Sequence, residues 1–174
     1  MKNITKNACV VFALLFVGCQ VFGQNEQKVY LGAGMGLDYG GFGGKVEYLP
    51  VKYFGIFGGV GHNLQTVGWN VGVTGKMLPD KKMSPNLMLF YGYNGALKVI
   101  GGSDYDMTCY GVTVGANLDI KLGRKGHKLS VGLFVPFRTT EFKDNYEAAK
   151  NDPNIETLAP LLPIMLGVGF NWKL

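Results

Sequence analysis

Nine charged side chains alternate with apolar residues along the chain, a spacing that would bring them to one face of a β-sheet. Successive side chains of a strand point to opposite faces, so each charge lies opposite its apolar neighbours. Most of the nine are bases, and together they could form ion pairs or hold an anion. The set is Lys45, Glu47, Lys76, Lys98, Asp119, Lys121, Lys128, Arg138 and Lys173.

Catalytic chemistry has little support in the sequence. A hydrolase needs a nucleophile, a base and an orienting group close together. The chain has two histidines, His62 and His127, and the strand order described below would place them at opposite ends. Ser103 could meet His62 and either Asp104 or Glu141 at one rim, but solvated loop residues are the ordinary interpretation. We expect no enzyme.

Metal and cofactor sites are not indicated either. Cys109 has no second Cys or nearby His, which a zinc site would need, so a buried thiol acting as a small hydrophobe is favoured. Gly44-Lys45 is followed by Val46, where a phosphate-binding loop needs Ser or Thr. We therefore expect no cofactor and no metal.

Alternation with a period of two dominates from Lys28 onward and predicts eight strands, most of about 9–13 residues, enough to cross a bilayer when tilted. In the clearest strand, 110–123, the even positions are apolar and the odd positions are small or polar. The pattern leaves open which face of 53–64 is the apolar one. The other seven strands cover residues 29–39, 42–48, 53–64, 67–76, 87–99, 128–138 and 162–174.

We expect the glycine-rich face to point inward and the bulky face outward. An eight-stranded barrel has an interior only just wide enough for its own side chains, so the bulky face would overfill it. A charge facing lipid costs about 2–4 kcal/mol at the bilayer midplane, and the apolar face carries none. A lipocalin-like barrel, the alternative, would instead show an outer face rich in Lys and Glu. The expected fold class is all-β, a transmembrane up-and-down antiparallel β-barrel of about eight strands.

Residues 1–23 have the features of a secretory signal peptide, and 24–174 would then form an outer-membrane β-barrel domain. A positively charged start precedes an apolar stretch too short to span a bilayer, and Gly23 offers a small residue for cleavage. The alternative is lipidation of Cys19. Because two lysines lie in 1–23, cleavage lowers the formal net charge from +5 to +3, too mild to imply nucleic-acid binding.

With the amino terminus in the periplasm, the turns at 49–52, 78–85 and 123–126 would lie on the periplasmic side and the longer connections outside. The longest outer connection, 139–161, could bind an extracellular partner, although a solvated loop would have the same composition. Within it, Asp144 and Glu147 have capping-box spacing, which predicts a short helix ending near Lys150.

Three segments carry a family likeness: Gly43-Gly44-Lys45-Val46-Glu47-Tyr48, Phe57-Gly58-Gly59-Val60-Gly61, and the ending 167–174. Through them the chain after residue 23 resembles the small outer-membrane β-barrel proteins, which include OmpX-like, OmpW-like and OmpA-transmembrane-domain-like barrels. In that family, apolar residues at the last, third-last and fifth-last positions form the insertion signal read by the barrel-assembly machinery. Leu174, Trp172 and Phe170 match this spacing, with Leu in place of the commoner Phe.

The resemblance implies a place in the bacterial outer membrane and is nearly silent on activity. We expect a monomeric barrel with a structural or surface-interaction role. Its expected partners are the outer-membrane lipid bilayer, the barrel-assembly machinery and an extracellular partner at 139–161. The alternative is a pore for small, preferably anionic, solutes or an uptake channel for hydrophobic compounds. Ion pairs filling so narrow a lumen favour the structural role.

Overall fold

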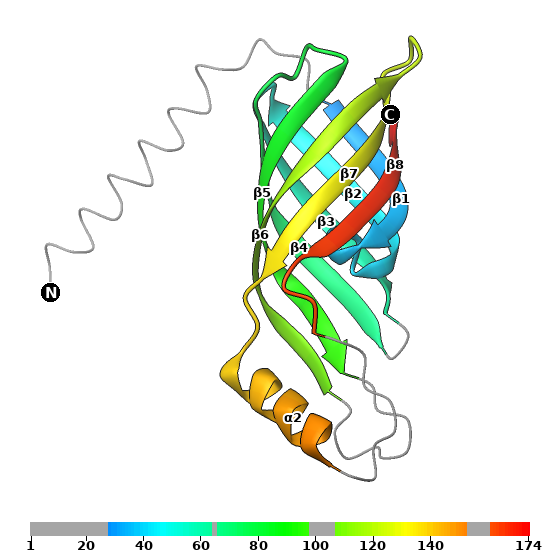
Figure 1. The fold of residues 1–174 in the computed structure, drawn as a ribbon. Helices are drawn as coiled ribbons and strands as arrows, with labels where there is room; N and C mark the ends of the chain where they lie inside the picture. The colour runs from blue at the N-terminus through cyan, green and yellow to red at the C-terminus, as the bar shows by residue number, and fades with distance from the viewer. Residues whose placement is uncertain (1–27, 64–65, 98–106, 153–160) are drawn as a thin grey trace, which may run out of the picture.

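The chain folds into a closed antiparallel barrel in which each strand pairs with the next and the last pairs with the first (Figure 1). The computed structural model describes residues 28–63, 66–97, 107–152 and 161–174. Within these ranges no helix is long and apolar enough to cross a membrane. The strands are β1 (Lys28–Gly36), β2 (Gly41–Val51), β3 (Phe54–His62), β4 (Val67–Lys76), β5 (Met83–Leu97), β6 (Met107–Leu122), β7 (His127–Pro136) and β8 (Met165–Lys173).

Side chains alternate across the barrel wall as the sequence predicts. In β6, Thr113, Asn117 and Asp119 are buried, whereas Val112 and Val114 are exposed. β3, whose facing the sequence left open, turns Phe57 inward and Ile56 outward. The Gly-rich face thus lines the interior, and the bulky apolar face forms the outer surface.

The connection between β1 and β2 folds into the barrel, where the sequence predicts a continuous strand to residue 39. β1 ends at Gly36, and the 3₁₀ helix η1 (Leu37–Tyr39) follows with all three side chains buried. Gly36, Gly40 and Gly41 have φ angles of 143°, 72° and 112°, which L side chains rarely adopt. These glycines reverse the chain, so Tyr39 lies inside the barrel instead of on its outer face.

Aromatic side chains fill one part of the interior. Phe90 packs edge-on against Phe57 and Phe134, with ring centroids 5.7 and 5.5 Å apart, a favourable geometry for aromatic pairs. Leu37 of η1 and Met88 complete this cluster. A Cβ at Gly115 would clash with the Phe134 ring, and a Cβ at Gly72 would clash with the Cβ and backbone of Phe90. Glycine therefore makes room for the phenylalanines inside a narrow barrel.

At the end of the barrel opposite the carboxyl terminus, β5 and β6 extend beyond their neighbours (Figure 1). The helix α2 (Thr140–Asn151) follows β7 in the chain and packs against this extension. Thr139 caps α2 by accepting a hydrogen bond from the amide of Phe142 at 3.3 Å. The helix therefore begins one turn earlier than the predicted cap at Asp144. Phe142 and Ala149 pack against Leu97 and Cys109 in a second small core. This part of the 139–161 connection is a docked helix, not a solvated loop.

Candidate functional site in the barrel interior

Four of the predicted lumen charges form one buried ion cluster. Lys76 Nζ lies 2.9 Å from Glu47 Oε1 and 3.0 Å from Asp119 Oδ2. Lys128 Nζ lies 2.8 Å from Glu47 Oε2 and 3.1 Å from Asp119 Oδ2. The residues come from β2, β4, β6 and β7, and no side chain among them is more than 9% exposed. The cluster is charge-neutral and links four strands across the interior.

Hydrogen bonds join this cluster to η1. Ser130 donates to Asp119 Oδ1 at 2.5 Å, Asn171 Nδ2 donates to Ser130 Oγ at 2.9 Å, and Tyr39 donates to Asn171 Oδ1 at 3.3 Å. The Lys128 ammonium also lies 3.6 Å from the centroid of the Tyr30 ring, a cation–π contact. Polar groups buried in an apolar surrounding are costly unless satisfied, so this continuous network favours one arrangement of the interior.

Lys45, another predicted lumen residue, pairs with Asp38 of η1 instead of joining the four-residue cluster. Its ammonium lies 4.3 Å from the centroid of the Tyr39 ring. The amide of Asn70 donates to the backbone carbonyl of Leu37. η1 is therefore held in the barrel by an ion pair, a cation–π contact and a hydrogen bond.

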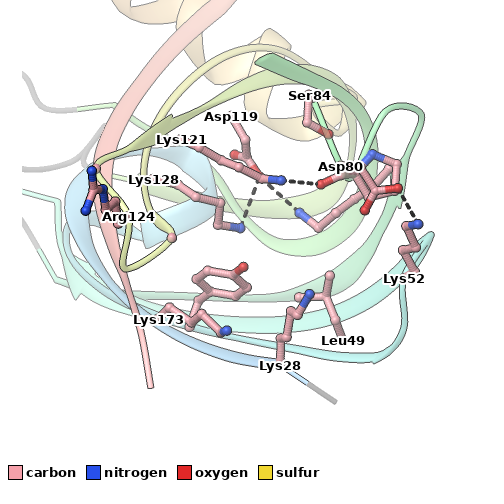
Figure 2. Close-up of a pocket in the computed structure, with 15 residues that line it drawn as sticks. Lys28, Leu49, Lys52, Asp80, Ser84, Asp119, Lys121, Arg124, Lys128 and Lys173 are labelled. Atoms are coloured by element: carbon pink, nitrogen blue, oxygen red, sulfur yellow. Dashed lines mark hydrogen bonds and ion pairs between the residues drawn. The ribbon is translucent and has the colours of Figure 1, made fainter. Parts of the chain in front are cut away.

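Beyond the ion cluster, a cavity of about 460 Å³ opens at the end of the barrel where the short turns lie (Figure 2). Lys121 and Lys173, both predicted to face the lumen, line it, and so do Lys28 and Arg124. The Lys121 ammonium donates to the carbonyl of Pro79 at 2.6 Å. Seven cationic side chains and two carboxylates, Asp80 and Asp119, line this cavity, which we call the vestibule.

At the rim of the vestibule, Lys52 forms an ion pair with Asp80 across two neighbouring turns. The hydrogen bond from Lys52 lowers the pKa of the Asp80 carboxyl and raises the pKa of the Lys52 ammonium. Asp80 is solvent-exposed and Lys52 is partly exposed, so the pair contributes little to stability. Its effect on the site is to neutralise one of the two carboxylates that line the cavity.

The remaining predicted residues lie elsewhere. Arg138 lies at the opposite end from the vestibule, where its guanidinium donates to the carbonyl of Leu162 at 2.7 Å. Lys98 lies outside the described residues. Trp172 and Leu174 of the predicted insertion signal are exposed on the outer surface, and the Phe170 and Trp172 rings are 4.9 Å apart. Their role as a signal stays a prediction.

A second cavity, of about 720 Å³, lies near the η1 end of β1 and has a mostly apolar lining. Leu37 and the partly buried Tyr93 and Met165, which pack against the interior aromatic cluster, line it together with outward-facing Met35 and Leu166. Because residues from both sides of the barrel wall contribute, this cavity begins at the outer apolar surface and reaches toward the interior. The sequence gives no indication of it, since it depends on the reversal of the chain at Gly36.

Several site residues have no signal in the alternation. Tyr39 continues the outward, apolar positions of the preceding strand, so nothing in the sequence marks its turn into the lumen, and nothing indicates the pairing of Asp38 with Lys45. Lys28 and Arg124 lie at a strand end and in a turn, where exposed charges are ordinary. Tyr30 is buried, whereas its neighbour Leu31 is exposed on the outer face. The alternation could therefore have identified Tyr30 as a lumen residue.

The described residues contain no group of three or more His, Cys, Asp or Glu side chains that could hold a metal ion. His62 and His127 lie at opposite ends of the barrel, at the end of β3 and the start of β7, while Ser103 and Asp104 lie outside the described residues. Comparisons with protein-family models, curated proteins and solved structures found no match for this chain.

Proposed function

We propose that the chain is a bacterial outer-membrane barrel with a closed lumen and a structural or surface-interaction role. The observation that carries this proposal is the packed interior. The ion cluster, the aromatic cluster and η1 occupy the barrel with side chains that are almost fully buried. Such an interior favours a rigid anchor over a pore, because a conducting path would have to break paired buried charges.

The outer surface supports the membrane part of the proposal. Each of the eight strands exposes large apolar side chains, and no Lys, Arg, Asp or Glu faces outward from a described strand. Exposed apolar patches of this extent are rare on monomeric proteins in water. A barrel also satisfies its backbone hydrogen bonds internally, as a lipid environment requires.

Labelling in intact bacteria tests both the location and the orientation. We expect a membrane-impermeant maleimide to label Glu147→Cys, on the exposed side of α2, but not Lys81→Cys, in the turn between β4 and β5. The unsubstituted chain is the control for labelling of buried Cys109. Equal labelling of both variants in intact cells, or recovery of the protein in the aqueous fraction without detergent, would refute the proposal.

Conductance and deletion separate the structural role from the alternatives. In planar bilayers we expect no discrete openings, and anion-selective openings would instead support the pore. Deleting 142–156 removes most of α2 and should leave the barrel folded. Loss of binding to a surface or partner in that variant would identify α2 as the interacting element.

Uptake of a hydrophobic compound is a second candidate, favoured by the apolar cavity near Met35 and Leu166. A fluorescent apolar probe such as N-phenylnaphthylamine should bind the detergent-purified protein and bind several-fold more weakly to Met35→Gln/Leu166→Gln. Leu87→Gln/Leu89→Gln, on the same outer surface but outside the cavity, is the matched control. Equal affinity in the two variants would exclude this cavity as the binding site.

A further inference from the structure

The vestibule carries an excess of positive charge that its own ion pairs do not neutralise. Lys76 and Lys128 are balanced by Glu47 and Asp119, and Lys52 is paired with Asp80. Three more cations, Lys121, Arg124 and Lys173, line the cavity without a salt bridge to a carboxylate in the described part of the chain. Among the described residues, no acid other than Asp80 and Asp119 lines the cavity.

These three cations come from separate segments that meet around one opening. Lys121 is near the end of β6, Arg124 is in the turn to β7, and Lys173 is at the end of β8. Figure 2 shows Lys121, Lys128 and Lys173 around the same opening, with Arg124 at its rim. The Lys121 ammonium is held by a neutral carbonyl, which positions the charge without cancelling it. Charged residues that only keep the end of a barrel hydrated would not have to gather around a single opening.

The cavity has the size and chemistry of a site for a small, multiply charged anion. Its volume of about 460 Å³ lies within the range of small-molecule pockets. Clustered charges of one sign between low-dielectric walls concentrate counter-ions. Lysine ammonium and arginine guanidinium groups are the side chains that bind phosphate oxygens most effectively, the latter in a bidentate manner. The buried ion cluster closes the inner end, so an anion would bind here and not pass through.

We propose that the vestibule binds a phosphate group, carried either by a small free metabolite or by a lipid headgroup. Lys121, Arg124 and Lys173 are the residues that hold it, with Lys128 at the inner wall. The site goes beyond the structural role proposed above. It depends on the charge of the vestibule and does not depend on which partner, if any, α2 binds.

Calorimetry on the protein purified from bacterial membranes in detergent tests this site, with inorganic pyrophosphate as the probe. We expect binding that weakens as salt is added, because screening reduces the attraction. Lys121→Gln/Arg124→Gln/Lys173→Gln should weaken it by about tenfold or more, as the loss of three charge contacts predicts. Lys81→Gln/Lys82→Gln/Lys143→Gln removes the same charge from exposed positions that do not line the cavity, and should bind as the unsubstituted chain does.

Two further measurements keep the test decisive if the triple variant folds poorly. Arg124→Gln alone changes an exposed turn residue and should still weaken binding measurably, whereas Lys121→Arg/Lys173→Arg should retain it. Dihexanoyl phosphatidic acid is the second probe. Tighter binding of pyrophosphate would identify a free phosphate compound as the ligand, and tighter binding of phosphatidic acid would identify a lipid headgroup. No binding of either probe, or equal weakening in the cavity and control variants, would overturn the proposal.

Discussion

At the residue scale, the buried ion cluster is the feature on which stability should depend most. Lys76 and Lys128 each contact both Glu47 and Asp119, so each carboxylate contacts two ammonium groups and the four charges sum to zero. A buried ion pair gains little over a well-packed apolar pair, but removing one partner leaves a charge in a poorly solvated site. The four residues therefore act as a unit.

Asp119→Asn should lower the free energy of unfolding by about 3–5 kcal/mol, the usual consequence of breaking a buried charge network. It removes the carboxylate that accepts from Lys76, Lys128 and Ser130. Glu147→Gln, which breaks the exposed pair with Lys150 on α2, should change stability by less than about 0.5 kcal/mol. Urea unfolding in detergent micelles measures both. Equal effects would show that the interior cluster is as solvated as the surface pair.

At the element scale, the alternation predicts most strands well but does not predict η1. The outward positions of β6 and β7 follow from the sequence because apolar and small residues alternate there without interruption. Leu37 and Tyr39 fit the same pattern, yet they turn inward because Gly36 and Gly40 allow the chain to reverse. Period-two spacing reports which residues share a face, and an apolar side chain is compatible with lipid or with a packed lumen. The candidate site was predictable for Glu47, Lys76, Asp119 and Lys128, but not for Tyr39.

The close contact between η1 and β8 leads to a prediction for Gly169. A Cβ at this position would lie against the Tyr39 ring, including Cε2 at 2.8 Å. Gly169→Ala should therefore lower the free energy of unfolding by about 1–3 kcal/mol, as overpacking does. Gly75→Ala is the matched control, because a Cβ there meets no atom within 4 Å.

A double-mutant cycle distinguishes this contact from a general loss of strand flexibility. In a Tyr39→Ala background the ring is gone, so Gly169→Ala should cost less, and the difference is the coupling between the two positions. If the cost of Gly169→Ala were the same with and without Tyr39, η1 would not lie against β8 in the folded protein.

The helix α2 provides a second test at this scale. Thr139→Ala removes the side chain that accepts from the Phe142 amide and should destabilise the helix by about 0.5–2 kcal/mol. Thr140→Ala, one residue further on, removes a hydroxyl that does not cap the helix and should have a smaller effect. Hydrogen exchange at the first turn of α2 measures both. Faster exchange in Thr140→Ala than in Thr139→Ala would place the start of the helix elsewhere.

At the scale of the whole molecule, the barrel reverses the usual distribution of side chains. Charges and amides are inside, for example Asn86, whose amide donates to Asn117 at 2.5 Å, and apart from the interior aromatic cluster most large apolar residues are outside. In water this surface would favour aggregation, whereas in lipid it needs no covering. A lipid surrounding would account for both the apolar exterior and the polar interior. A charged substitution on the outer surface should show whether that surface contacts lipid or water.

Leu89→Arg makes that test. Leu89 lies near the middle of β5, is 50% exposed, and pairs with Val73 of β4 and Val114 of β6. If the outer surface contacts lipid, an arginine there should cost about 2–4 kcal/mol when unfolding is measured in phospholipid vesicles. Ala148→Arg adds the same side chain to the exposed face of α2 and should change stability by less than about 0.5 kcal/mol. A Leu89→Arg protein as stable as Ala148→Arg, or one that stays in solution without detergent, would mean that the apolar surface does not face a bilayer.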